Sequence, residues 1–526
     1  MNRFDAQSGI PPVLARKEVE LKLLLPPKSL PALKKVPFLR AINGLAKRTT
    51  EVSVYFDTDK RQLHKQGLIL RVRKVGDQYV QTIKSSGGAS PFERDEWEAA
   101  IAGEQPDLRL AKGTALETLL CGKLRGQLKP LFETRVRRSF YHLTDDTRAL
   151  ALTIDRGTID TGKRSLPLCE IELELEHGDV SDLFKFAREL IRFVPARLAL
   201  KSKSERGYEL VDGGQDMPVK AGPINISADA STRDAFQMIG SACLEQIIGN
   251  EAAVIKGDPE GVHQMRVGLR RLRAGMSLFA GLVNDPQSTA LKAGLKRLAT
   301  ELGPARELEV LVKRVVAPIR RQRARWDTAV PALSRDLVRE REKAVVLAQH
   351  AVRSSRFRAL TLEIATWLQS GEWTMPQDEL VRDRGDLPIG VFATERLSRR
   401  FRNLCRRREA LAQLDARSLH KLRIQTKKLR YAVEFLANLF TSKRASKRRK
   451  LLAPVLERLQ DALGELNDIA VDEARLAVLG RRRGAGRNRA FAAGLLTGRE
   501  DARIEAALKR ATQAYAQLAK VKPFWE

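Results

Sequence analysis

The sequence predicts a protein in two parts: an N-terminal α+β part built as an antiparallel β-tunnel, followed by an all-α, internally duplicated helical bundle. Three observations lead to this prediction. Residues 1–212 consist mainly of short segments in which charged and apolar residues alternate, which is the period of a β-strand. Across residues 227–526, apolar residues recur at the 3.6-residue period of an α-helix. The intervening residues 213–226 are rich in Gly and Pro, which is typical of a linker.

The net charge of the chain indicates the class of its partners. The 526 residues carry a formal net charge of +31, and 43% of them are hydrophobic, which is normal for a globular protein. Such an excess of positive charge predicts a polyanionic partner: nucleic acid, an anionic membrane surface or a phosphate polymer. Residues 1–215 contribute +8 and the remaining residues +23. We therefore expect most of the polyanion-binding surface in the helical part.

Cysteine usage and hydropathy predict a cytoplasmic protein without a membrane anchor. The four cysteines are scattered, with no pair at metal-ligand spacing, which is typical of a reducing compartment rather than a disulfide framework. The N-terminus lacks a basic start followed by an apolar run of signal-peptide length. No stretch approaches the ~18 apolar residues that a membrane span needs.

The first predicted strand places three charges on one face. Glu18, Glu20 and Lys22 alternate with apolar residues, so they point one way and their apolar neighbours point the other. A solvent-exposed face usually mixes charged residues with Ser, Thr, Asn and Gln. Two carboxylates and an ammonium aimed at one place suit the interior of a barrel instead.

The same alternation recurs in later strands and favours a shared charged interior. The members are Arg71 and Arg73; Thr82 and Lys84; Arg94, Glu96 and Glu98; Arg135 and Arg137; and Glu170, Glu172 and Glu174. Three carboxylates on one strand face repel each other unless a cation lies among them. For any single strand, a solvated face with cross-strand ion pairs is the alternative. Two helices are also expected in this part, around residues 113–125 and 179–193.

These segments together resemble the CYTH family, also called triphosphate tunnel metalloenzymes, over residues 14–212. The ordered motifs are Glu18-x-Glu20-x-Lys22, Leu70-Arg71-Val72-Arg73, Thr82-Ile83-Lys84, Arg94-Asp95-Glu96-Trp97-Glu98, Glu170-Ile171-Glu172-Leu173-Glu174 and Ser202-Lys203-Ser204-Glu205-Arg206-Gly207. The resemblance implies a β-tunnel that holds a linear triphosphate and a divalent cation, Mg²⁺ or Mn²⁺. Hard cations prefer oxygen ligands, and arginines bind phosphate oxygens in bidentate fashion.

The resemblance also implies roles for individual residues. The catalytic residues would be Glu18, Glu20 and Lys22, with Glu18 or Glu20 positioning the attacking water. The triphosphate-binding residues would be Arg71, Arg73, Lys84, Arg94, Arg135, Arg137 and Lys203, and the metal-binding residues Glu18, Glu20, Glu170, Glu172 and Glu174. Asp155 is either a further member or a turn residue.

The substrate of the tunnel is expected to be inorganic triphosphate. Members of the family act on inorganic triphosphate, on thiamine triphosphate, on an RNA 5′ end, or on ATP for cyclisation. The sequence offers no aromatic cage for a thiazolium or adenine ring, so inorganic triphosphate is the simplest substrate for an all-charged tunnel. A protein that only binds polyphosphate, without turnover, is the alternative.

The helical part repeats internally. The segment 263–273 (His-Gln-Met-Arg-Val-Gly-Leu-Arg-Arg-Leu-Arg) matches 420–430 (His-Lys-Leu-Arg-Ile-Gln-Thr-Lys-Lys-Leu-Arg), and Asp258 and Asp415 precede them at the same offset. A second pair of matching segments follows downstream, in 295–308 and 456–469. The spacing predicts a duplicated bundle with repeats at about 227–375 and 385–520.

Each repeat presents a narrow file of basic residues, which we call the basic file. Its members are His263, Arg266, Arg270 and Arg273 in the first copy, and His420, Arg423, Lys427 and Arg430 in the second. In the first copy they fall within an arc of about 80° on a helix. A single histidine per helix lacks a second metal ligand four residues on, so an anion is favoured over a metal. A solvated helix face is the alternative for either copy alone.

This repeated pattern resembles the CHAD domain (conserved histidine α-helical domain) over about residues 226–520. The resemblance implies pairing with a CYTH module, binding of inorganic polyphosphate, and a location at polyphosphate granules. Nucleic acid is the less favoured partner, because only 6% of the residues are aromatic and they are not interleaved with the basic file.

Overall fold

The computed structural model describes residues 14–42, 46–85, 92–120, 122–214, 216–313, 329–406, 411–481 and 486–526. The chain divides into two compact units. The first, the tunnel unit, comprises Met1–Met217 together with Ser354–Gly371. The second, the helical unit, comprises Pro218–Arg353 and Glu372–Glu526.

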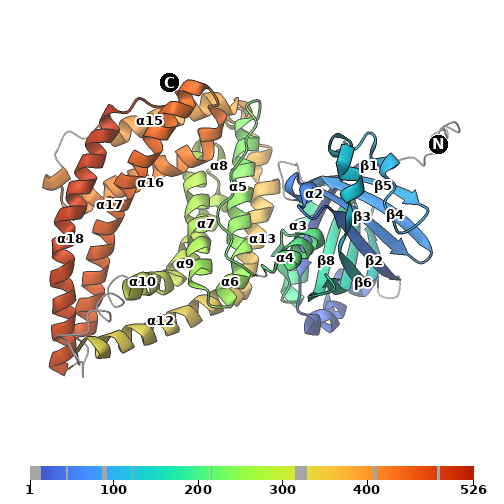
Figure 1. The fold of residues 1–526 in the computed structure, drawn as a ribbon, viewed down its shortest axis with the longest axis horizontal. Helices are drawn as coiled ribbons and strands as arrows, with labels where there is room; N and C mark the ends of the chain where they lie inside the picture. The colour runs from blue at the N-terminus through green and yellow to red at the C-terminus, as the bar shows by residue number, and fades with distance from the viewer. Residues whose placement is uncertain are drawn as a thin grey trace. The chain divides into compact units, whose positions relative to one another are not determined.

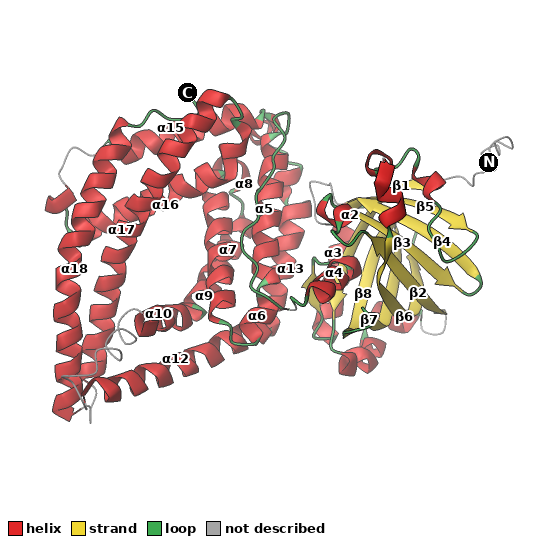
Figure 2. Cartoon of the chain, in the orientation of Figure 1, coloured by secondary structure: helices red, strands yellow, loops and turns green. Residues whose placement is uncertain are grey.

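Eight antiparallel strands close into a barrel in the tunnel unit (Figure 1; yellow in Figure 2). They are β1 (Leu14–Leu24), β2 (Lys47–Asp57), β3 (Leu68–Val75), β4 (Gln78–Ser85), β5 (Glu93–Ile101), β6 (Lys129–Thr144), β7 (Ala149–Asp160) and β8 (Ser165–His177). Their order is β5-β4-β3-β2-β6-β7-β8-β1, and pairing of β1 with β5 closes the ring. The short strand β9 (Arg197–Ala199) pairs with β1. The predicted antiparallel tunnel is confirmed.

Apolar residues on the outer face of the barrel pack against helices. Leu21 and Leu23 of β1 are fully buried on the face opposite Glu18, Glu20 and Lys22. Helix α3 (Val180–Phe193) packs on β1 and β8, and its Leu183 and Phe184 are fully buried. The barrel therefore has an apolar outside beneath helices and a charged inside.

A helix from the later part of the chain completes the tunnel unit. Helix α13 (Ser355–Ser370) packs against α3 and β9. The guanidinium of Arg188 in α3 donates to the carboxylate of Glu363 in α13, with Nε–Oε1 2.8 Å. Sequence periodicity does not distinguish α13 from the helices of the bundle, because it carries the same 3.6-residue pattern.

The remaining short elements of the tunnel unit connect the strands. They are the 3₁₀ helices η1 (Pro27–Lys35), η2 (Leu108–Ala111), η3 (Glu117–Leu119) and η4 (Gly122–Gln127), and the helices α1 (Pro37–Ala41), α2 (Gln62–Lys65) and α4 (Lys203–Asp212). The helix expected at 113–125 forms only η3 and part of η4. Helix α4 begins with a capping box in which Ser202 and Glu205 satisfy each other's backbone N–H groups.

The helical unit is built from α-helices in its described part (red in Figure 2). They are α5 (Thr232–Gly249), α6 (Glu251–Ile255), α7 (Pro259–Leu278), α8 (Ala280–Val283), α9 (Pro286–Glu301), α10 (Gly303–Leu311), α12 (Ala329–Arg353), α14 (Glu379–Asp386), α15 (Ile389–Cys405), α16 (Ala416–Leu436), α17 (Lys443–Arg481) and α18 (Gly486–Lys520), with 3₁₀ turns η6 (Glu372–Thr374), η7 (Leu411–Gln413) and η8 (Ala437–Leu439). None of the described helices is long and apolar enough to cross a membrane.

The two matching segments form equivalent helices that touch each other. Asp258 caps the N-terminus of α7, and Asp415 caps that of α16. The two helices pack together. The segment before the bundle also packs on this unit, because Ile224 and Ile226 are buried and the Val219 N–H donates to Asn250 Oδ1 at 2.9 Å.

Candidate active site

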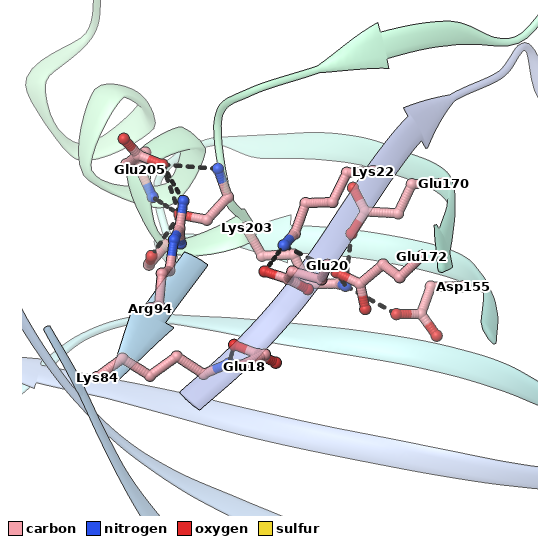
Figure 3. Close-up of polar contacts among 12 residues, drawn as sticks. Glu18, Glu20, Lys22, Lys84, Arg94, Asp155, Glu170, Glu172, Lys203 and Glu205 are labelled. Atoms are coloured by element: carbon pink, nitrogen blue, oxygen red, sulfur yellow. Dashed lines mark hydrogen bonds and ion pairs between the residues drawn. The ribbon is translucent and has the colours of Figure 1, made fainter. Parts of the chain in front are cut away.

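The strand register brings the predicted carboxylates to one wall of the tunnel. Lys22 of β1 lies opposite Glu172 of β8, and Glu20 lies opposite Glu174. On the other side of β8, Asp155 of β7 lies opposite Glu170. Directly opposed residues in a sheet point to the same face, so these side chains share the interior of the barrel (Figure 3).

The opposite wall carries most of the arginines. Arg71 and Arg73 of β3 face the tunnel beside Lys84 of β4, and Arg94 comes from β5. The Lys84 ammonium contacts Glu18 Oε2 at 2.5 Å and Glu96 Oε1 at 2.9 Å. Arg73 Nη2 donates to Glu98 Oε1 at 3.1 Å. Each basic group on this wall therefore has a carboxylate neighbour.

The cavity between the walls has a volume of about 100 Å³ and is lined mainly by ionisable groups. Among the described residues, seven basic side chains line it (Lys22, Arg71, Arg73, Lys84, Arg94, Arg138 and Lys203), and so do six carboxylates (Glu18, Glu20, Glu96, Glu98, Glu172 and Glu174). The charges nearly cancel. An anion of several charges would therefore be best accommodated together with a cation.

Lys203 stands among three carboxylates at one end of the wall. Its ammonium lies 2.8 Å from Asp155 Oδ2, 2.5 Å from Glu170 Oε1 and 2.9 Å from Glu172 Oε1. One oxygen from each of these three carboxylates lies within 4.8 Å of the others, which is close enough for a metal ion. We call Asp155, Glu170 and Glu172 the acidic cluster.

Arg138 and Arg206 complete the charge balance of the acidic cluster. The guanidinium of Arg138 binds Asp155 in bidentate fashion at 2.7 and 2.8 Å and reaches Glu172 at 3.3 Å. Arg206 of α4 donates to Glu170. Three carboxylates thus face three cations, and Asp155 and Glu170 have no exposed surface.

Burial and neighbouring charges shift the pKa values of the ionisable side chains in the tunnel. Burial opposes the ionisation of Glu172, but Lys203, Lys22 and Arg138 outweigh it and hold the pKa of this carboxyl well below its ordinary value. Burial likewise opposes the charge of Lys203, yet the acidic cluster raises its pKa. Complete burial lowers the pKa of Lys22 to about 8, against the pull of Glu172.

The tunnel fits both an anion and a hard divalent cation. The buried Nε atoms of Arg71 and Arg73 have no hydrogen-bond partner among the described residues. Buried donors in native proteins are rarely left unpaired, so these two fit the oxygen atoms of a bound anion. The carboxylate oxygens of the wall are the donor type that Mg²⁺ and Mn²⁺ prefer.

Two of the predicted residues lie outside the tunnel. Arg135 and Arg137 of β6 are exposed on the outer face, and Arg135 pairs with Glu133. Arg138 faces inward instead, because it lies opposite Asp155 in the register of β6 with β7. The prediction that Arg135 and Arg137 lie in the tunnel is therefore wrong, and Arg138 is the arginine of β6 that lines the cavity.

The other predicted tunnel residues meet in or directly behind the cavity, and further residues join them. Glu170 lies behind the lining, held by Lys203 and Arg206. Glu96 and Glu98 belong to the predicted charged interior but were given no role, and Arg138 was missing from the prediction. Asp155 lies within β7 beside Glu170 and Glu172, so it is a further member of the site rather than a turn residue. The alternation of Arg94, Glu96 and Glu98 was a usable signal for the two glutamates. Nothing in the sequence alone marks Arg138, because its inward orientation depends on the register of β6 with its neighbouring strand.

In the helical unit, four members of the basic file lie near one another: Arg266 and Arg270 of α7, and Arg423 and Lys427 of α16. We call these four the inner basic file, and the other four its outer members. Burial lowers the pKa of Arg423, and Arg270 adds to this effect from the facing helix. Burial, Arg423 and Arg270 lower the pKa of Lys427 to about 7. Asp468 lies near both side chains and opposes these shifts. The buried Nε atoms of Arg270 and Arg423 have no hydrogen-bond partner among the described residues.

The outer members of the basic file, His263, Arg273, His420 and Arg430, are placed less favourably for binding an anion. Arg273 and His420 are exposed, and Arg430 lies near Asp461. Burial lowers the pKa of half-buried His263, and Arg306 adds to this effect.

Two of the inner members also make hydrogen bonds within the protein. Arg266 Nη1 donates to the carbonyl of Ala299 at 2.6 Å, and Arg423 Nη1 donates to Asn467 Oδ1 at 3.1 Å.

Comparison with known proteins finds matches to both parts of the chain. The family model of the CYTH domain matches residues 16–208, and that of the CHAD domain matches residues 239–477. An inorganic triphosphatase from Haemophilus influenzae is 30% identical over 210 residues, which are 37% of this chain and 55% of that protein. The chain thus spans about half the length of this curated relative.

Two solved structures are each similar to part of the chain. A crystal structure of the CHAD domain from the plant Ricinus communis shares 30% identity, covers 56% of this chain and 96% of its own, and has a TM-score of 0.47. A putative adenylyl cyclase from Hippeastrum, described as having a dominant triphosphatase activity, shares 19% identity. It covers 38% of this chain and 98% of its own, with a TM-score of 0.30.

Proposed function

We infer that this chain, which joins a member of the CYTH family to a CHAD domain, hydrolyses inorganic triphosphate with a divalent cation and binds inorganic polyphosphate through its helical unit. The observation that carries the first part is the lining of the tunnel, in which basic and acidic groups alternate around a single cavity. Phosphoryl transfer needs positioning and charge neutralisation more than covalent help, and this lining supplies both.

The basic groups of the tunnel would bind the phosphate oxygens. Arg71 and Arg73 offer Nε atoms without partners, and Lys84 and Arg94 flank them. Lys22, whose pKa is about 8 through burial, carries its proton at neutral pH and would hold a phosphate on the opposite side. Arg138 contributes in place of Arg135 and Arg137.

The carboxylates would hold the divalent cation and the attacking water. Glu20, Glu172 and Glu174 line one wall, with Glu170 behind it and Glu18 nearby. When bound, Mg²⁺ or Mn²⁺ neutralises phosphate charge and makes phosphorus easier to attack. Glu18 or Glu20 would orient the water in line with the leaving phosphate, because both are buried carboxylates in the cavity wall.

The helical unit would bind polyphosphate through the inner basic file. Arg266, Arg270, Arg423 and Lys427 come from α7 and α16, which touch each other, and two of these guanidinium groups have unpaired Nε atoms. A flexible polyanion would satisfy these donors and relieve the repulsion between the cations. We also propose that this protein is cytoplasmic and is located at polyphosphate granules.

A phosphate-release assay with the full chain tests the enzymatic part. We expect release from inorganic triphosphate with Mg²⁺ or Mn²⁺, and loss of at least about 100-fold in kcat for Glu172→Gln. Arg137→Ala, on the outer face, is the matched control and should keep full activity. No release with either metal would leave a protein that only binds phosphate polymers.

A substrate panel separates the alternatives. Thiamine triphosphate, ATP and longer polyphosphate are assayed beside triphosphate, and cyclic nucleotide is sought with ATP. A higher kcat/KM for thiamine triphosphate, or cyclic nucleotide from ATP, would reassign the substrate. Retention of longer polyphosphate by wild type, but not by an Arg270→Ala/Arg423→Ala variant, supports the role of the helical unit.

A further inference from the structure

Lys203 occupies the position among the acidic-cluster oxygens that a divalent cation would take. Its ammonium lies within 2.9 Å of one oxygen of each of Asp155, Glu170 and Glu172 (Figure 3). With Arg138 and Arg206, it neutralises the cluster completely. A metal ion that entered now would have to displace the Lys203 ammonium and would still be repelled by the guanidinium groups of Arg138 and Arg206.

The backbone beneath Lys203 is held in place, so its side chain is the part able to move. Ser202 and Glu205 form the capping box at the start of α4. Tyr208 Oη donates to the buried carboxylate of Asp57 at 3.1 Å. A Cβ on Gly207 would lie 2.1 Å from the Phe132 ring, so helix and strand pack without a gap. Lysine, by contrast, carries its charge on a flexible four-carbon stem.

The same side chain lines the cavity that would hold the anion. Lys203 borders the cavity together with Ser202, Ser204 and Glu172. A triphosphate there offers the ammonium oxygen partners of higher charge. Rotation of the stem toward the anion would leave three carboxylates, two of them fully buried, short of one cation, which is costly unless another cation replaces it.

We propose that Lys203 is a resident counter-ion that divalent metal must replace, so that metal and triphosphate bind the tunnel cooperatively. Without the anion, the ammonium holds the acidic cluster closed to metal. With the anion, the ammonium moves to phosphate and frees Glu170 and Glu172 for the metal. Linkage then requires that each ligand strengthens the binding of the other by the same factor. The inference rests on the proposed function for the identity of the anion.

Mn²⁺ binding to the full chain, measured by electron paramagnetic resonance of free Mn²⁺ without any anion, tests this role. Wild type should bind Mn²⁺ weakly at the cluster, and Lys203→Met at least about tenfold more tightly. Lys203→Gln, which keeps a hydrogen-bond donor but no charge, should behave like Lys203→Met and guards against a folding defect in either variant. Lys17→Met removes an exposed ammonium that pairs with Glu93 outside the cavity and should leave Mn²⁺ affinity unchanged.

A second titration is carried out in the presence of a non-hydrolysable imidotriphosphate. The binding of Mn²⁺ to the imidotriphosphate alone is measured separately, without protein. Wild type should then bind Mn²⁺ at least about tenfold more tightly than it does without the anion, and Lys203→Met should gain less than threefold. Equal Mn²⁺ affinity of wild type and both Lys203 variants without the anion would overturn the inference, even if triphosphate is hydrolysed. Cooperative binding without hydrolysis would instead support the inference and remove the enzymatic function.

Discussion

Arg138 illustrates how a single side chain stabilises the charged interior. It binds Asp155, which has no exposed surface, through two hydrogen bonds, and it also reaches Glu172. Buried carboxylates are tolerated only while they are paired. Arg138 is thus needed for stability whether or not a ligand is present.

Replacing Arg138 by Met should destabilise the tunnel unit. Asp155 would keep Lys203 but lose its bidentate partner, and we expect a loss of about 2–4 kcal/mol in the free energy of unfolding. Arg137→Met, one residue away on the exposed face, should change it by less than about 0.5 kcal/mol. Urea denaturation followed by the fluorescence of the tunnel unit measures both, and equal effects would contradict the inward placement of Arg138.

At the scale of elements, helix α4 is positioned by close packing against strand β6. Gly207 lies against the ring of Phe132, which stacks on Tyr55 in the adjacent strand. The same helix carries Lys203 and Arg206 to the acidic cluster. A shift of α4 therefore moves two of the cluster's three cations.

Gly207→Ala should weaken the site without touching a charged group. The added methyl carbon would lie 2.1 Å from the Phe132 ring, so the helix must move away from the barrel. We expect a rise in KM for triphosphate of about tenfold, with a loss of about 1–3 kcal/mol in stability from overpacking. Gly103→Ala, where a Cβ meets no atom within 4 Å, is the control in steady-state kinetics. Unchanged KM in Gly207→Ala would show that α4 does not position the site.

The contact between α7 and α16 predicts a pH dependence of polyphosphate binding. Lys427 has a pKa of about 7, because burial and the nearby Arg423 and Arg270 disfavour its charge more than Asp468 favours it. It therefore loses its proton as the pH rises through about 7. A bound polyanion favours the charged form, so binding should take up a proton and weaken between about pH 7 and pH 9.

Isothermal titration calorimetry with long-chain polyphosphate, in buffers of different ionisation enthalpy, measures this proton uptake. We expect uptake near pH 8 in wild type and its absence in Lys427→Arg, whose guanidinium keeps its charge over this range. The affinity of Lys427→Arg should then vary less with pH. Identical pH profiles for the two proteins would exclude Lys427 from the binding surface.

At the scale of the whole molecule, the tunnel unit is not a continuous piece of the chain. Helix α13 belongs to it, although residues 218–353 separate this helix from the rest of the unit. It covers part of α3, whose other side lies on the strands that carry Glu20 and Glu172. The first 217 residues alone therefore lack one of the helices that complete the unit.

A fragment of residues 1–217 should be less stable than the tunnel unit in the full chain. Exposing even one large apolar side chain on α3 costs about 2 kcal/mol, which corresponds to a fall in Tm of roughly 4–8 °C. Differential scanning calorimetry of the fragment and the full chain measures the difference. Addition of a peptide covering residues 354–371 should recover part of it, and an unchanged Tm would show that α13 contributes no stability.

The sequence by itself determined the alternation that places Glu18, Glu20 and Lys22 on one face, and the two matching helices with their Asp caps. Both follow from local periodicity, which is set by the backbone geometry of strands and helices. Only the tertiary structure decided that Arg138 rather than Arg137 faces the acidic cluster. Strand parity depends on hydrogen bonding to a neighbouring strand, and a shift of one residue reverses every side chain. The place of Lys203 among three carboxylates, and of α13 beside α3, likewise depends on contacts between residues far apart in the chain.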